Sequence, residues 1–196
     1  MTCTDCLPDR EFDHPKSEPE SVVIQPQFAR FHRADNAFTQ GLVHLCKSVL
    51  VRKTLVEIGS FSGESAEVFA QYFGHVYCID IWDPVFFGTT EFDGSPEDIF
   101  LKRTAVFNNL TQIKGRGVDA VKLFKDKSIS CVYIDAMHEY EPVIEDIRSW
   151  LPKVSVGGVI SGHDYDVAHP GVFQAVNEVF GKPELTFCDN SWLVRL

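Results

Sequence analysis

Short apolar runs alternate with segments of helical spacing through most of the chain. The run TLVEIG at residues 54–59 ends at a glycine, ESAEVFAQYF at 64–73 repeats its apolar residues at helical spacing, and HVYCIDI at 75–81 is again a short apolar run. Apolar runs of about four to eight residues are typical of buried strands, whereas recurrence about every three to four residues indicates an amphipathic helix. This stretch therefore predicts a strand, a helix and a second strand.

The same alternation continues towards the carboxyl terminus. A helix is expected over residues 95–110, because Ser95 is a good N-cap residue and Pro96 suits the first helical position. The remaining predicted elements are strands at 111–115, 128–135, 156–164, 184–189 and 191–196, and helices at 118–124, 139–151 and 171–180. Strands that alternate with helices predict an α/β fold, a single Rossmann-like, doubly wound, mostly parallel seven-stranded sheet with helices on both faces.

Two segments depart from this rhythm. Residues 1–25 are rich in Pro, Asp, Glu and Ser without periodicity, which predicts a disordered or poorly ordered tail and leaves residues 26–196 as the folded domain. One or two helices are expected between Phe28 and Val49, ahead of the first strand. Residues 82–95, WDPVFFGTTEFDGS, predict a long loop, and long loops in compact domains are often functional.

The charge balance limits the class of partner. With a formal net charge of −10, the chain lacks the basic field with which nucleic-acid binders attract phosphates, so nucleic acid is not an expected partner. No apolar run approaches the roughly 20 residues of a membrane span, and the N-terminus has no apolar signal-peptide core. We therefore expect no membrane contact and a cytoplasmic location, and whether the chain forms a homodimer stays open.

Of the six cysteines, only Cys3 and Cys6 form a close pair. Such a CxxC pair can be half of a zinc site, but no second Cys/His pair follows at ligand spacing, and His14 alone would leave the metal with too few ligands. We interpret Cys3 and Cys6 as incidental. The other four cysteines lie singly in apolar contexts and are expected in the core.

Acidic side chains stand where four of the predicted strands end. In open parallel sheets, ligands bind outside the carboxyl ends of the strands, so these acids are candidates for a binding site. The four are Glu57, Asp80, Asp135 and Asp164. A carboxylate in the position of Asp80 can accept both hydrogen bonds of a ribose diol.

The first turn, VEIGSFSGES, is rich in glycine but is not a dinucleotide fingerprint. That fingerprint is G-x-G-x-x-G, and Phe61 and Glu64 stand where it requires glycines after Gly59. The pattern E-x-G-x-x-x-G fits instead. A nicotinamide-dependent oxidoreductase is therefore an alternative that the turn disfavours.

The stretches LVEIGSFSGES, VYCIDIWD and VYIDAMHEYEPVIEDIRSWLPKVSVGGVISGHDY, followed by HPGVFQAVNEVF, resemble the class I S-adenosylmethionine (SAM)-dependent methyltransferases. They are most similar to a small-domain branch with the motifs I-D-x-x-H-x-Y and G-G-x-x-x-G-H-D-Y, over roughly residues 53–182. The resemblance implies SAM as the cofactor. It further implies a set of cofactor-binding residues: Glu57, Gly59, Ser60 and Gly63 at its amino-acid part, Asp80 at the ribose, Ile81 and Trp82 beside the adenine, and Asp135. Arg116 and Gly117 depart from the acid-small pair often found near the adenine in this family.

Asp135 and Asp164 end strands that are neighbours in this fold, so their carboxylates are expected to converge over the cleft. Converging carboxylates suit a hard divalent cation such as Mg²⁺, which we predict as a second, optional cofactor held by Asp135 and Asp164. Metal-assisted relatives carry a further acid where Met137 stands here. His138 and His163 could compensate as proton acceptors, so the predicted catalytic residues are His138, His163 and Asp135.

Each histidine also has a structural interpretation. His138 could cap the helix or bond a loop carbonyl, and His163 could simply pack between strand and helix. The acids that follow on the predicted helix are expected to face water: Glu139, Glu141, Glu145 and Asp146. The prediction for function is methyl transfer from SAM to a hydroxyl oxygen of a small polar acceptor. A SAM-binding protein without catalysis is the other alternative.

Overall fold

The structure of the chain, a computed structural model, describes residues 19, 22, 36–83 and 94–196. The predicted tail with Cys3 and Cys6, the helix predicted near Phe28 and most of the 82–95 loop therefore lie outside the described residues. The helices are α1 (Asn36–Ser48), α2 (Glu64–Tyr72), α4 (Pro96–Thr104), α5 (Gly117–Ala120), α6 (Tyr140–Trp150) and α7 (Pro170–Phe180), with 3-10 turns η2 (Val121–Leu123) and η3 (Leu151–Lys153). Among them, none combines the length and apolar character needed to cross a bilayer.

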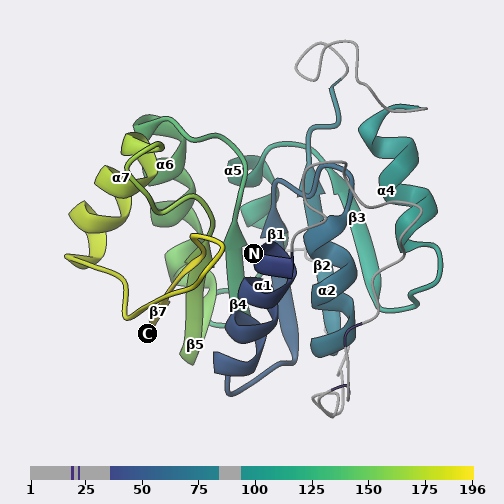
Figure 1. Ribbon diagram of the computed structural model, residues 1–196, viewed down its shortest axis with the longest axis horizontal. Coiled ribbons are helices and arrows are strands. Elements are labelled where there is room, and N and C mark those ends of the chain that lie inside the picture. The colour runs from purple at the N-terminus through teal and green to yellow at the C-terminus, as the bar shows by residue number, and fades with distance from the viewer. Residues whose placement is uncertain (1–18, 20–21, 23–35, 84–93) are drawn as a thin grey trace, which may run out of the picture.

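The strands of the described chain form one seven-stranded sheet (Figure 1). They are β1 (Thr54–Ile58), β2 (His75–Asp80), β3 (Leu110–Lys114), β4 (Ile129–Ile134), β5 (Val154–Gly162), β6 (Leu185–Thr186) and β7 (Trp192–Arg195). Their order is β3-β2-β1-β4-β5-β7-β6, and only β7 runs antiparallel to its neighbours. The chain moves outwards from β1 to β3 and then returns to place β4 beside β1. The predicted fold class is confirmed, and the order of strands reverses between β1 and β4.

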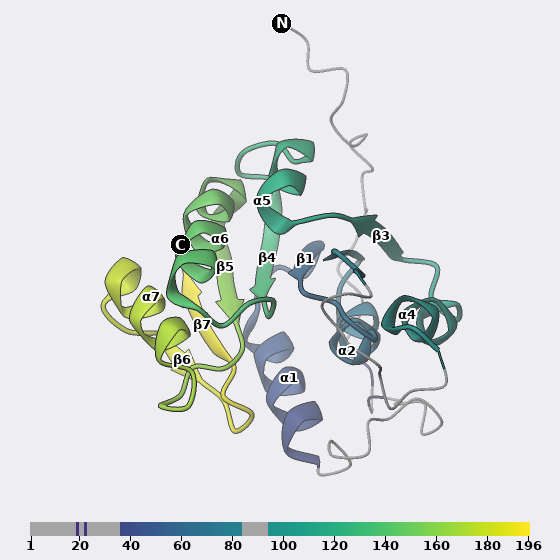
Figure 2. The same ribbon diagram turned by 90° about the horizontal axis from the view of Figure 1, so that it is seen from above.

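Helices cover both faces of this sheet, as Figure 2 shows from above. Helices α1, α2 and α4 lie on one face, and α5, α6 and α7 contribute to the core on the other. Strand β1 contributes side chains to both cores, because Val56 and Ile58 belong to one and Leu55 to the other. This alternation follows from the two-residue period of a strand, and continuous apolar runs are what a sheet buried on both faces requires.

Helix α4 begins as predicted but ends early. Ser95 and Asp98 form a reciprocal capping box, and Pro96 occupies the first turn. The helix stops at Thr104, whereas the sequence pattern predicted a helix to residue 110. The buried side chain of Asn109 explains part of the difference, because its amide donates to the carbonyl oxygens of Ala70 and Phe73 and ties the chain to the end of α2.

Three of the four cysteines predicted to be core residues are buried, namely Cys46, Cys78 and Cys131. Cys188 is exposed instead. It lies in the turn between β6 and β7, and its Sγ lies 3.4 Å from the carbonyl oxygen of Ala37 in α1.

Candidate functional site

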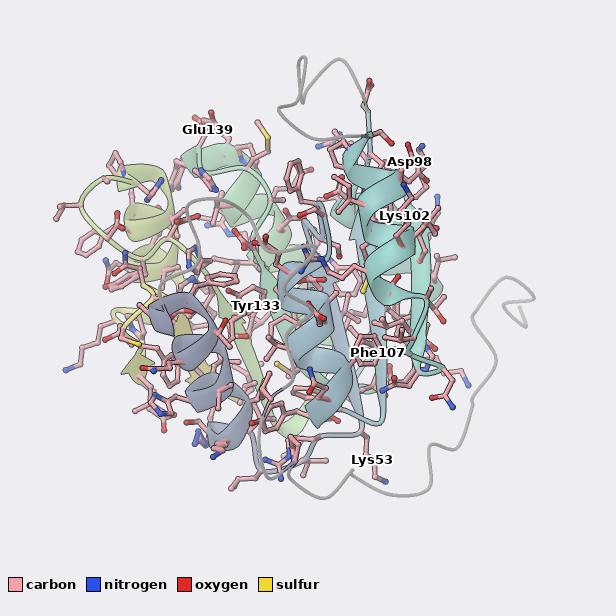
Figure 3. All side chains as sticks on the ribbon, turned by 45° about the vertical axis from the view of Figure 1, so that its right-hand side comes forward. Lys53, Asp98, Lys102, Phe107, Tyr133 and Glu139 are labelled. Atoms are coloured by element: carbon pink, nitrogen blue, oxygen red, sulfur yellow. The ribbon has the colours of Figure 1, made fainter. Side chains whose placement is uncertain are left out.

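A cavity of about 1140 Å³ opens at the carboxyl ends of the parallel strands. In Figure 3, Glu139 at the start of α6 lies at this end of the molecule, and Lys53, just ahead of β1, lies at the opposite end. The cavity is lined by the turn after β1, the end of β2, the loop after β3, the segment after β4, one side of α6 and the region after β5. Its position is the one expected for a ligand at the point where strand order reverses.

Gly59 brings the turns after β1 and β4 together. It has φ +92°, and a Cβ at this position would lie 2.1 Å from the carbonyl oxygen of Asp135. No other residue fits both the backbone conformation and this close approach. The N–H of Asp135 in turn donates to the carbonyl oxygen of Ile58, and the N–H of His163 donates to that of Ile134. The strand ends that carry the predicted site residues are therefore held side by side by the backbone.

Glu57 supports the wall of the cavity from behind. It is fully buried and does not line the cavity, in contrast to the expected direct contact with the cofactor. Its carboxylate accepts hydrogen bonds from the hydroxyls of Ser60, at 2.7 Å, and Ser65. Burial raises the pKa of Glu57 to about 7, although the two serine hydroxyls oppose the rise. Ser60 and Ser65 line the cavity, so Glu57 acts by orienting them.

Asp80 lines the cavity and braces its neighbours. Oδ2 accepts from the N–H of Phe61 at 2.8 Å, and Oδ1 accepts from the N–H of Trp82 at 2.7 Å. Each carboxylate oxygen keeps a further acceptor site, so a diol can still bind. Burial raises the pKa of Asp80, and these amides counteract the rise only in part.

Ile81 lines the cavity, but Trp82 and Gly63 do not, in contrast to the expected contacts with the cofactor. Trp82 is 3% exposed and packs against Phe100, with ring centroids 4.9 Å apart. Its indole N–H donates to the carbonyl oxygen of Phe61. The left-handed backbone of Trp82, with φ +40°, turns the ring back into the core. Gly63 lies against the same ring of Phe100.

Three imidazoles surround the carboxylate of Asp164. Its Oδ2 lies 2.9 Å from Nε2 of His138, and its Oδ1 lies 2.9 Å from Nδ1 of His163 and 3.6 Å from Nδ1 of His169. Burial by itself raises the pKa of Asp164, but His138 and His163 outweigh it and hold this pKa well below its usual range. Asp164 is therefore an anion across the physiological pH range, held in a left-handed backbone conformation with φ +60°.

The two predicted histidines have different surroundings. His138 lines the cavity with a side chain that is 46% exposed, and the Asp164 carboxylate, 2.9 Å away, raises its pKa. His163 does not line the cavity. Its ring is 10% exposed and packs edge-to-face on Phe38, with centroids 5.6 Å apart. Burial lowers the pKa of His163, but the Asp164 and Asp135 carboxylates raise it overall. Nδ1 of His163 lies 2.9 Å from Asp164, but neither ring nitrogen of His163 has a hydrogen-bond partner within the described part of the chain.

His169 is a cavity residue that our reading of the sequence missed. It stands at the N-cap position of α7, its Nδ1 lies 3.0 Å from Oδ1 of Asp166, and its ring packs against that of His138 with centroids 4.9 Å apart. His169 belongs to the HPGV stretch at the start of α7. A histidine before Pro170 is typical of an ordinary helix start, so this pattern did not indicate a site residue.

Two groups of side chains in this region could hold a cation. One comprises Asp135, His163 and Asp164, and the other comprises His138, Asp164 and His169; within each group the ligand atoms lie within 4.8 Å of one another. The first group contains both predicted ligands. Oxygen with imidazole is a donor set that suits divalent ions softer than Mg²⁺ as well as Mg²⁺ itself. Met137 is 45% exposed and lines the cavity without offering a hard ligand.

The expectation that all four acids of α6 and its start face water is wrong for Asp146. Glu139, Glu141 and Glu145 are exposed as predicted, but Asp146 is buried and lines the cavity. It falls on the apolar stripe of α6, between positions such as Val143 and Trp150, because a helix returns to the same face every three to four residues. Arg116 lies nearby at the N-cap position of α5 and forms an ion pair of 3.5 Å with Glu145.

Similarity to known proteins identifies the family. A family described as Methyltransferase domain matches residues 56–165. Uncharacterized protein R132 of Acanthamoeba polyphaga mimivirus is 32% identical over 136 residues, which are 64% of this chain and 58% of the relative. Uncharacterized protein y4gI of Sinorhizobium fredii is 25% identical over 181 residues, 84% of this chain and 19% of the relative. The chain thus spans less than two thirds of the length of these curated relatives.

Solved structures share the fold. An rRNA methylase from Streptococcus thermophilus superposes with a TM-score of 0.57 at 14% identity, covering 82% of this chain and 95% of that one. The O-methyltransferase NovP gives 0.55 at 18% identity, over 80% and 78% of the two chains. Phosphoethanolamine N-methyltransferase 1 from Haemonchus contortus, solved with phosphoethanolamine and S-adenosylhomocysteine (SAH), gives 0.51 at 19% identity, over 69% and 27%. Because the family match covers more than half of the 196 residues, the chain belongs to the Methyltransferase domain family, and its sheet has the fold of these solved structures.

Proposed function

We propose that the protein transfers the methyl group of SAM to a hydroxyl oxygen of a small polar acceptor, bound at the Asp135, His138 and Asp164 end of the cavity. The observation that carries this proposal is the His138–Asp164 pair, in which Nε2 of a cavity-facing imidazole lies 2.9 Å from an anionic carboxylate. We also propose that residues 26–196 form the catalytic domain. The formal net charge of −10 favours a small molecule over RNA as the acceptor.

The order of the strands supports one placement of the cofactor. Asp80 at the end of β2 would hold the ribose hydroxyls, and the turn with Gly59 and Ser60 after β1 would hold the amino-acid part, with Ile81 beside the base. The sulfonium would then lie near Asp135 after β4. In this arrangement Glu57, Gly63 and Trp82 support the pocket without lining it.

His138 is the proposed proton acceptor. A neutral hydroxyl is a poor nucleophile and must lose its proton at or before attack on the methyl group. Because Nε2 of His138 lies 2.9 Å from Oδ2 of Asp164, Nδ1 would remain available to take the proton, and Asp164 would stabilise the imidazolium that forms. His163 contacts Asp164 from the buried side, so we assign it the positioning of that carboxylate in place of direct catalysis.

A divalent cation would be held by Asp135 and Asp164, with His163 as a third ligand from the same group. Bound there, it would polarise the acceptor hydroxyl and lower its pKa. Chelator treatment followed by addition of Mg²⁺ or Mn²⁺ tests this part of the proposal. Turnover that is unchanged by chelation would remove the cation and leave His138 as the sole source of activation.

The acceptor can be sought by screening hydroxylated small molecules for SAH release. With an acceptor in hand, His138→Ala should lower kcat by about 100-fold or more, the usual contribution of a general base, while SAH affinity stays unchanged. His44→Ala is the matched control, because His44 is exposed on α1 and does not line the cavity. Equal activity of both variants would contradict the assignment of His138.

A further inference from the structure

Asp146 lies in the middle of α6, on the face that packs against the sheet and α5. It is 8% exposed and borders the cavity. A Cβ added at Gly117 would lie 2.7 Å from Oδ1 of Asp146 and 2.7 Å from Cγ2 of Ile58, so the carboxyl sits directly against the start of α5. Within the described residues no hydrogen bond to this carboxyl is present. The carboxyl oxygens are not among the enclosed polar atoms that lack a partner, so they face the cavity, where a ligand group can reach them.

The cavity beyond Asp80 is where the base of the cofactor must lie. In the proposed arrangement the methyl-transfer end lies over β4 and β5, and Asp80 holds the ribose at β2, in a sheet of order β3-β2-β1-β4-β5. In SAM the purine and the methionine chain leave the ribose in opposite directions. The purine therefore extends away from Asp135, towards the loop after β3 and α6. That part of the cavity is lined by residues 115–119, Glu145 and Asp146.

Adenine presents an amino donor beside a ring-nitrogen acceptor, and a neutral carboxyl presents the complementary pair, a carbonyl acceptor beside an O–H donor. We propose that Asp146 recognises the adenine of SAM as a neutral carboxylic acid, accepting from the amino group and donating to the adjacent ring nitrogen. The proposal rests on the methyltransferase function and names a specificity residue for its cofactor. The proposal also explains why the acid-small pair of the family can be replaced by Arg116 and Gly117. The acid comes from α6 instead, and its carboxyl occupies the space that a side chain at Gly117 would fill.

The charges around Asp146 favour its neutral form. Burial raises its pKa to about 7; Glu145 on the same helix adds to the rise, and Arg116 opposes it. From α5, Asp119 is a further acid at the cavity wall, while β1 contributes only the apolar Ile58 at this contact. Arg116 is engaged with Glu145, so it does not neutralise Asp146 by direct contact. An uncharged acid is therefore available near neutral pH.

The first test measures SAH binding by calorimetry at about pH 6 and about pH 8.5. For the wild type, the dissociation constant should rise by about tenfold between the two, because the ionised carboxylate loses its donor and faces the lone pair of the ring nitrogen. Asp146→Asn keeps a donor beside an acceptor at both pH values, so its affinity should change by less than about threefold. Glu141→Gln, the same chemical change at an exposed position of α6, should keep the wild-type pH dependence.

The second test replaces the adenine of SAH by purine, which lacks the amino group. The wild type should bind this analogue about tenfold more weakly than SAH, whereas Asp146→Leu should bind both equally and at the weaker level. A merely structural role for Asp146 would weaken both ligands without removing the preference.

The outcomes of these tests distinguish the role of Asp146 from the methyltransferase function on which it rests. A wild type that binds SAH with no pH dependence and no preference for adenine would overturn the role of Asp146 and leave the methyltransferase function intact. A wild type that binds neither SAH nor SAM at either pH would contradict the methyltransferase function itself. Asp146→Leu that still prefers adenine, with an unchanged circular dichroism spectrum, would also overturn the proposal.

Discussion

Asp164 and Asp146 line the same cavity in opposite electrostatic states. Asp164 lies among three imidazoles, and its pKa is held well below the usual range against the effect of burial. Asp146 is buried without a hydrogen-bond partner among the described residues, and its pKa is raised to about 7. Burial disfavours the charged form of both side chains, so only the partners decide the outcome. One end of the cavity is thereby suited to proton transfer, and the other to neutral hydrogen bonding.

The largest expected effect is the loss of kcat on removing the negative charge of Asp164. Asp164→Asn keeps the size of the side chain but removes the charge that stabilises an imidazolium at His138, so kcat should fall by about 100-fold to 10,000-fold. Steady-state kinetics with an identified acceptor measure the loss. Asp166→Asn is the control, because Asp166 contacts His169 but does not line the cavity, and it should stay within about threefold of the wild type. Equal losses of kcat in the two variants would show that the charge of Asp164 has no special role in proton transfer.

The neutral carboxyl of Asp146 should make the free energy of unfolding depend on pH. The pKa of Asp146 lies at about 7 in the folded chain against an ordinary value of 3.8, so its neutral form is favoured by folding. The stability that this neutral form provides is complete below about pH 4 and is lost as pH rises through about 7. The shift corresponds to at most about 4 kcal/mol. Asp146→Asn should therefore unfold at higher temperature than the wild type at pH 8, and at the same temperature near pH 4.

Thermal unfolding of both proteins across this pH range measures the difference, with Glu141→Gln as the control on the same helix. If the wild type and Asp146→Asn kept the same separation at every pH, the carboxyl of Asp146 would not titrate near neutrality. Glu57 has its pKa raised to about 7 by burial as well, so the wild type and both variants should share a further loss of stability over the same range.

Asp80 lies between the two ends and gives a smaller effect. Its carboxylate accepts from the amides of Phe61 and Trp82 and, in the proposal, from the ribose hydroxyls. Asp80→Ala should weaken SAM binding by more than about tenfold, because hydrogen bonds to a buried charged acceptor are each worth about 1.5 to 3 kcal/mol. Calorimetry that finds equal affinity for wild type and variant would contradict the ribose assignment.

The secondary structure of the described core was predictable because local patterns carry it. Continuous apolar runs marked the strands that are buried on both faces, and helical spacing marked α2, α6 and α7. The strand-end rule then brought Asp80, Asp135 and Asp164 to one edge before any contact was known. The early end of α4 was not predictable in the same way, because the buried bonds of Asn109 to Ala70 and Phe73 join segments far apart in the sequence.

The sequence by itself determined the class of fold, the family resemblance and the acids at the strand ends, because these depend on residue type, spacing and order. Only the tertiary structure decided what surrounds each acid. Glu57 accepts hydrogen bonds from two serines, Asp164 contacts the imidazoles of His138, His163 and His169, and Asp146 has no hydrogen-bond partner among the described residues. The protonation state of a carboxyl depends on burial and on the few groups within contact distance, and chain folding alone brings those groups together.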